Sequence, residues 1–206
     1  MLEAGTDEAG TSAFPGEFLA SLAEDTTVCI YDRPGTSASS SDPPDRARGY
    51  DDLIAVLDGV LAELELEPPY VVAGQSGGGN IAISYAMRHP ERVAGLLTID
   101  SYHDDPAEMA AWQAEEGFTW EDNPEHVDWV QAAAQQDAHP LPIGDFPVRI
   151  LSATQADPGG AENQAYWLGL SSDARQIVIE GPHDLQWAVP DAVVAQFRTL
   201  LDELQE

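Results

Sequence analysis

Short, continuous apolar runs alternate with stretches of helical spacing along most of the chain, and this alternation constrains the fold most strongly. Continuous runs are typical of strands in a parallel sheet covered on both faces. Strands that alternate with helices predict an α/β fold with a mostly parallel sheet and flanking helices. The expected strands are Val28–Tyr31, Tyr70–Ala73, Leu96–Ile99, Val148–Leu151 and Gln176–Ile179.

Three helices have clear sequence signals. Asp51–Leu66 carries leucines at helical spacing behind two aspartates that favour a helix N-terminus, and Pro68-Pro69 stops it. A second helix is expected over Ile81–Arg88, and the last one begins near Pro190.

The region of about 102–146 has no strand-like run and is expected to form a small helical insertion. It holds Trp112, Trp120 and Trp129, three of the five tryptophans. Aromatic residues in such a region either pack in a core or line a pocket, and both interpretations stay open. His103-Asp104-Asp105 predicts a solvated turn rather than a set of metal ligands.

Composition limits the function classes. A chain of 206 residues suits one domain, and we expect 1–206 to form a single domain that contains the insertion. Lys+Arg is 8 against Asp+Glu 37, a net charge of -29, which argues against nucleic-acid and anionic-membrane partners. The acidity fits either an ordinary solvated surface or an adaptation to high salt. No cofactor or metal is expected. The single Cys29 excludes an internal disulfide. The N-terminus carries no signal sequence, which predicts a cytoplasmic protein.

Gly74-Gln75-Ser76-Gly77-Gly78 stands directly between an expected strand and an expected helix. A G-x-S-x-G segment in that context predicts a sharp turn that lifts the serine hydroxyl above the sheet in a strained backbone conformation. Glycines flank the serine because side chains there would clash with the neighbouring strand and helix. The following helix N-terminus directs N–H groups toward developing negative charge.

A phosphate-binding loop is the competing interpretation of these glycines. A P-loop requires a lysine before Ser or Thr, and the chain contains no lysine. A dinucleotide-binding fingerprint requires G-x-G-x-x-G spacing, which Gly74, Gly77 and Gly79 do not have. The sequence therefore favours a nucleophilic serine.

A nucleophilic serine needs a base, and the base needs an orienting acid. His183 follows the last expected strand, at the same sheet edge as Ser76, whereas the histidines of the insertion are expected to be exposed. Two aspartates follow expected strands: Asp157 after Val148–Leu151, and Asp100 after Leu96–Ile99. Either choice gives the chain order Ser, Asp, His.

These features together resemble the α/β-hydrolase superfamily, in particular small serine hydrolases with a short helical lid. The segments that carry the resemblance are Tyr31–Ser37, Gly74–Gly78, Arg88–Val93 and Gly181–Asp184 followed by Pro190. The resemblance implies Ser76 as nucleophile, His183 as base and Asp157 as acid, because an aspartate at the position of Asp100 is usually not catalytic in the family.

Leu2–Thr6 resembles the family's oxyanion loop after its third strand, with Glu-Ala-Gly in place of His-Gly. The resemblance implies the backbone N–H groups of Thr6 and Gly77 as oxyanion donors. Family members carry two strands and most of a third before this loop, so we expect an N-terminally truncated sheet. Buried unpaired backbone groups would then make the chain poorly stable alone.

The leading hypothesis is a serine hydrolase that cleaves ester or related acyl bonds of a small molecule through an acyl-enzyme. One alternative is a catalytically incompetent fragment or binding protein with this fold. Another is a cofactor-free haloperoxidase or carbon–carbon bond hydrolase, which would share the triad, and fold analogy does not choose among these.

Overall fold

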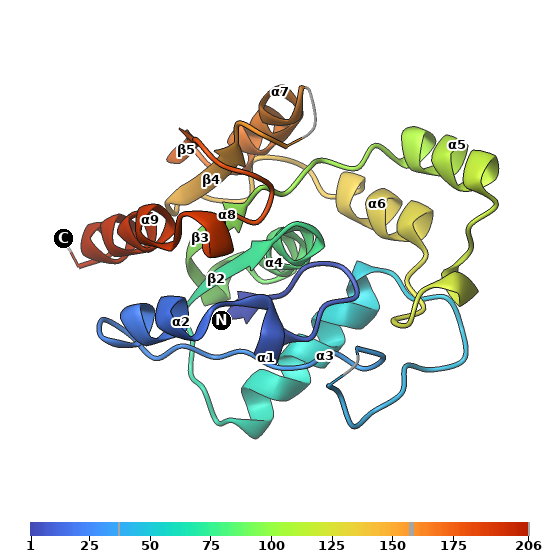
Figure 1. The fold of residues 1–206 in the computed structure, drawn as a ribbon, viewed down its shortest axis with the longest axis horizontal. Helices are drawn as coiled ribbons and strands as arrows, with labels where there is room; N and C mark the ends of the chain where they lie inside the picture. Colours follow the sequence, from blue (N-terminus) through green and yellow to red (C-terminus); the bar gives the residue numbers. More distant parts are fainter. Residues whose placement is uncertain (37, 157–158, 206) are drawn as a thin grey trace.

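The computed structural model describes residues 1–36, 38–156 and 159–205, which build one parallel sheet in the strand order β1-β2-β3-β4-β5 (Figure 1). The strands are β1 (Leu2–Glu3), β2 (Tyr70–Gln75), β3 (Val93–Ile99), β4 (Val148–Ala153) and β5 (Ala174–Ile179). Their carboxyl ends therefore meet at one edge, where open parallel sheets place their sites.

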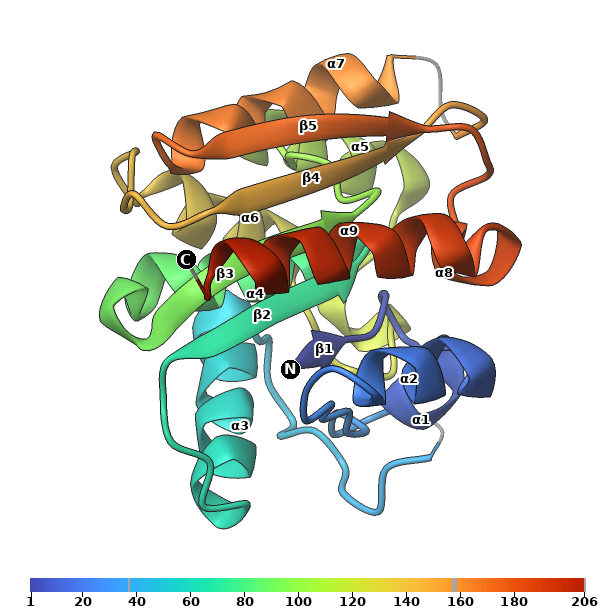
Figure 2. The ribbon, with the colours of Figure 1, turned by 90° about the vertical axis from the view of Figure 1, so that its left-hand side faces the viewer.

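Helices cover both faces of the sheet (Figure 2). On one face, α1 (Gly10–Ala13), α2 (Gly16–Ala23), α8 (Leu185–Ala188) and α9 (Pro190–Glu203) form one core with residues of β1, β2, β3 and β4, and α2 packs against α9. On the other face, α3 (Tyr50–Glu63), α4 (Gly77–Arg88) and η3 (Ala165–Leu170) enclose a second core, and α7 (Gly160–Gln164) precedes η3. Coverage of both faces explains the continuous apolar runs of the central strands. Among the described residues, none of the helices has the length and hydrophobicity of a membrane span.

Between β3 and β4, the chain forms α5 (Pro106–Glu116), η2 (Trp120–Asp122) and α6 (Trp129–Asp137), with α5 and α6 side by side (Figure 1). Asp105 caps α5, because its Oδ1 accepts hydrogen bonds from the N–H groups of Ala107 and Glu108, and Pro106 occupies the first position. The predicted helical character of the insertion is confirmed, as is the fold class. The short η1 (Pro90–Arg92) leads into β3.

Four of the five predicted strands are present, but the prediction of a strand at Val28–Tyr31 is wrong. This segment runs beside β1, where the N–H of Leu2 donates to the Cys29 carbonyl at 2.9 Å. β1 is only two residues long, so it offers too few backbone groups for a regular ladder on that side.

Candidate active site

Ser76 occupies a strained turn between β2 and α4, as the sequence predicts. Its backbone φ is 53° and ψ is -129°, a conformation that residues other than glycine rarely adopt. A Cβ on Gly74 would lie 2.3 Å from the Gly78 backbone, and one on Gly78 would lie 2.2 Å from the Ala4 carbonyl oxygen. Gly74 and Gly78 are therefore required because the neighbouring backbone leaves no room for a Cβ. Ser76 itself is half-buried.

Asp100 follows β3 directly beside Ser76. Gln75 and Ile99 are paired in the parallel ladder, so Ser76 and Asp100 occupy matching positions at two adjacent strand ends. The N–H of Ser76 donates to the Ile99 carbonyl at 2.9 Å. Neighbouring strands are about 4.8 Å apart, so the backbones of Ser76 and Asp100 lie side by side.

His183 contacts Asp100 with its ring. Nδ1 of His183 lies 2.7 Å from Oδ2 of Asp100, across 83 positions of sequence. His183 reaches this point from the loop after β5, with 41% of its side chain exposed, whereas Asp100 is fully buried. A carboxylate at Nδ1 requires the proton on that nitrogen, which leaves Nε2 to act as the acceptor.

Two further hydrogen bonds hold the Asp100 carboxylate. Its Oδ1 accepts from the N–H of Ala153 at 2.9 Å and from Nε2 of Gln164 at 2.6 Å. Asp100 also has a positive φ of 48°, which aspartate tolerates better than most residues. The carboxylate is thus fixed in the orientation that meets the imidazole.

The acid implied by the family resemblance, Asp157, lies outside the described residues. The carboxylate that the structure places on His183 is that of Asp100, the alternative that the residues themselves left open. Both aspartates follow strands that end at the same sheet edge, so sequence position alone could not distinguish them.

The backbones of Thr6 and Gly77, the oxyanion donors implied by the resemblance, lie close together. A Cβ on Gly77 would lie 3.5 Å from the Thr6 nitrogen, so the two backbones approach each other beside Ser76. Within residues 1–36, 38–156 and 159–205, neither the Thr6 nor the Gly77 N–H donates to another protein group. Two N–H groups in this arrangement can receive a developing negative charge.

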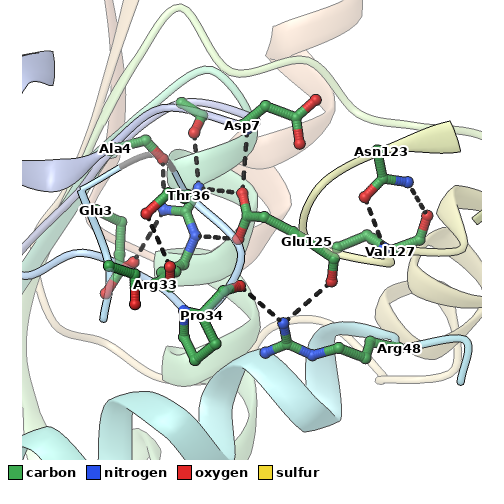
Figure 3. A network of polar contacts seen from close by, with 12 residues as sticks. Glu3, Ala4, Asp7, Arg33, Pro34, Thr36, Arg48, Asn123, Glu125 and Val127 are labelled. Carbon is green, nitrogen blue, oxygen red and sulfur yellow. Dashed lines mark hydrogen bonds and ion pairs between the residues drawn. The ribbon is translucent and has the colours of Figure 1, made fainter. Parts of the chain in front are cut away.

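A buried ionic network holds the loop that carries Thr6 (Figure 3). Arg33 donates to the carbonyl oxygens of Ala4 at 2.9 Å and Gly5 at 2.7 Å, and it forms a two-point ion pair with Glu125 at 2.7 and 2.8 Å. Because Glu125 lies between η2 and α6, the network joins the loop that carries Thr6 to the insertion. Nothing in the local sequence signals this contact.

Glu3 is the second carboxylate of this network. Its Oε2 lies 3.5 Å from Nη1 of Arg33, and the Tyr31 hydroxyl donates to it at 3.3 Å. Burial raises the pKa of Glu3 to about 7, although Arg33 acts in the opposite direction.

A cavity of about 350 Å³ opens beside Ser76, within the size range of small-molecule sites. It is lined by Thr6, Ser76, Gly77, Asn80, Tyr102, Asp104, Met109, Trp112 and Trp129. Of the three insertion tryptophans, two line this cavity and the third, Trp120, packs edge-on against His126. A second cavity of similar volume lies at the amino ends of β1, β2 and β3, at the opposite edge of the sheet from Ser76.

Two expectations for the insertion are wrong. Asp104 is not part of a solvated turn, because it lines the cavity and its Oδ2 accepts from Nδ2 of Asn80 at 3.3 Å. His103 is half-buried rather than exposed, since its ring stacks on Tyr166 at 3.6 Å and its Nε2 lies 2.8 Å from Oδ1 of Asp137. His103 contacts η3 and α6, and Asp104 contacts α4, all of which are distant in sequence, so their local sequence does not show this packing.

Comparison with known proteins agrees with this geometry. A sequence profile described as "alpha/beta hydrolase fold" matches residues 8–155, nearly three quarters of the chain. The chain is 30% identical over 93 residues to "Putative carbamate hydrolase RutD" of Caulobacter segnis; the match covers 45% of this chain and 34% of that protein, so the chain spans about a third of the length of this curated relative.

Two solved structures share the fold at low identity. A thermophilic esterase from Thermogutta terrifontis has a TM-score of 0.72 and 18% identity, covering 100% of this chain and 89% of that one. "Putative non-heme bromoperoxidase BpoC" from Mycobacterium tuberculosis has a TM-score of 0.74 and 15% identity, covering 98% and 91%. With the profile match, these findings show that the chain belongs to the α/β-hydrolase fold family.

Proposed function

We propose that the protein is a serine hydrolase that cleaves ester or related acyl bonds through an acyl-enzyme. The observation that carries the proposal is the 2.7 Å contact between His183 and Asp100, made directly beside the strained turn of Ser76. Ser76, Asp100 and His183 follow three different strands at one sheet edge, which supports their proposed roles as nucleophile, orienting acid and base in acyl transfer.

The proposed mechanism follows from the positions of these groups. The Ser76 hydroxyl attacks the carbonyl carbon, and Nε2 of His183 takes its proton. Asp100 holds Nδ1 protonated and stabilises the imidazolium that forms. The Thr6 and Gly77 N–H groups bind the oxyanion, and loss of one such donor would cost about 3–4 kcal/mol in the transition state. His183 then protonates the leaving group, and water deacylates Ser76 by the reverse path.

The insertion is proposed to act as the lid of a single domain. It supplies Met109, Trp112 and Trp129 to the cavity, and Glu125 ties it to the loop that carries Thr6. Carbamates are acyl compounds that the same attack could cleave, so the carbamate hydrolase named among the relatives fits within the proposed class.

A panel of chromogenic esters with short to long acyl chains tests the proposal. We expect turnover by the wild-type chain and its loss, by about 10⁴-fold or more, in the Ser76→Ala variant. A folded wild-type chain that hydrolyses no ester, carbamate or thioester would favour the catalytically incompetent alternative. Ester turnover that persists in Ser76→Ala would contradict the assignment of the nucleophile.

A further inference from the structure

We propose that Asp104 makes the cavity beside Ser76 selective for acyl substrates that carry a protonated amine. The inference rests on the proposed hydrolase activity and names the substrate class of the same site. Asp104 and Ser76 line the same cavity. A substrate whose carbonyl group is attacked by Ser76 can therefore place another of its groups at the Asp104 carboxylate.

The position of Asp104 is set from the nucleophile's own helix. Asn80 lies four residues after Ser76 in α4, on the same side of the helix, and only 3% of it is exposed. Its Nδ2 donates to Oδ2 of Asp104 at 3.3 Å. Oδ2 of Asp104 is therefore held by the buried amide of Asn80, one helical turn from Ser76.

The other carboxylate oxygen of Asp104 has no protein partner in the described part of the chain. None of the ion pairs formed there includes Asp104, and Arg33, which donates to the Ala4 and Gly5 carbonyls next to Thr6, is already paired with Glu125. The adjacent His103 attracts the charge of Asp104, but its Nε2 forms its close contact with Asp137 instead. A partly buried carboxylate without an ion pair is costly, and a cation brought by a substrate would offset that cost through a charge-assisted hydrogen bond.

The ionisation state of Asp104 and the tryptophans that line the same cavity favour the same ligand. Burial raises the pKa of Asp104 to about 6, so the carboxylate is still mainly ionised above neutral pH. Trp112 and Trp129 line the same cavity, and tryptophan rings attract ammonium groups. A carboxylate or phosphate on the substrate would instead be repelled.

Two matched esters test the inference: dimethylaminopropyl acetate and its carbon isostere, isohexyl acetate. They differ in a protonated nitrogen against a C–H, and both release acetate. At about pH 7.5, we expect kcat/KM for the amine ester to exceed that for the isostere by about tenfold or more. Asp104→Asn should bring the ratio close to one, because the amide keeps the shape and removes the charge.

Asp202→Asn is the matched control, since it removes one charge from an exposed position on α9. The ratio should stay unchanged in this variant. If Asp104→Asn does not fold, Trp112→Leu serves instead and should lower the ratio several-fold. Equal turnover of the two esters by the wild-type chain, or a preference that survives in Asp104→Asn, would overturn the inference.

Binding measurements separate this inference from the proposed function. In Ser76→Ala, which has no nucleophile, tryptophan fluorescence can be titrated with dimethylaminopropanol and with isohexanol. Tighter binding of the amine, lost in Ser76→Ala/Asp104→Asn, supports the cation site even if no ester is hydrolysed, in which case the hydrolase proposal alone fails. Equal binding of both alcohols overturns the cation site.

Discussion

At the scale of single residues, the proposed chemistry depends on two side chains held in uncommon backbone conformations. Ser76 and Asp100 both have positive φ, and they occupy matching positions after β2 and β3. In each case the positive φ ends the strand abruptly. Strain at adjacent strand ends is typical of sites where the surrounding structure holds a functional geometry.

The identity of the acid can be tested by paired substitutions. Asp100→Asn keeps an oxygen for the Ala153 and Gln164 donors but allows the wrong imidazole tautomer, so we expect kcat to fall by about 10³–10⁴-fold. Asp157→Asn should leave kcat within a few-fold of wild type. Ester turnover by both variants, with thermal melts as the folding control, provides the measurement. The reverse pattern would assign the acid to Asp157.

The sequence predicts the serine turn and the base because their signals are local. A G-x-S-x-G segment between an apolar run and a helix has one geometric solution, and His183 follows the last strand. The acid has no such signal. Choosing between two strand ends requires knowing which carboxylate the His183 loop reaches, and that is a property of the folded loop.

At the scale of elements, close packing between β1, β2 and α4 positions the serine. Gly78→Ala would place a Cβ 2.2 Å from the Ala4 carbonyl oxygen, so we expect it to destabilise the fold by about 2 kcal/mol or more and to lower ester turnover. Gly59→Ala is the control, because nothing lies within 4 Å of its Cβ in α3. It should stabilise the chain by up to about 1 kcal/mol. Urea denaturation of both variants checks this, and equal effects would argue against the close approach.

The network under the oxyanion loop predicts a pH-dependent stability. The pKa of Glu3 is raised from 4.5 to about 7, so the folded chain binds this proton more tightly than the unfolded chain. The free energy of unfolding should therefore decrease as the pH rises from about 5 to about 8, by at most about 3 kcal/mol from this group. Glu3→Gln should lose that part of the pH dependence.

An exposed glutamate provides the control for this measurement. Glu63→Gln, at the end of α3, should keep the wild-type pH profile in urea unfolding. Parallel profiles for wild type and Glu3→Gln would show that Glu3 does not titrate in this range.

Elements were predictable where they bury a continuous apolar face. β2, β3 and β4 and the helices α3, α4 and α9 follow from such patterns. β5 was also predicted from its apolar run, although it is only partly buried and Val178 is 57% exposed. Val28–Tyr31 has the same composition as a strand, but its neighbour β1 is too short to pair with it regularly. The contact of Arg33 with Glu125 joins segments 92 positions apart and could not be read from either one.

At the scale of the whole molecule, acidity dominates the surface. The net charge is -29, and Asp+Glu 37 against Lys+Arg 8 leaves most carboxylates without an arginine to pair with. Self-repulsion of this kind destabilises the compact state and is screened by salt.

We therefore expect Tm to rise between about 0.1 M and about 1 M sodium chloride, as the Debye length shortens from about 10 to about 3 Å. Differential scanning calorimetry checks this. A Tm that does not rise would argue against adaptation to high salt and leave an ordinary solvated acidic surface as the interpretation.

Labelling with a fluorophosphonate, followed by peptide mapping, tests the central claim most directly. The account predicts a single phosphonylated residue, Ser76, with labelling abolished in Ser76→Ala and strongly slowed in His183→Ala and Asp100→Asn. Labelling at another residue, or an unchanged rate in His183→Ala, would contradict it.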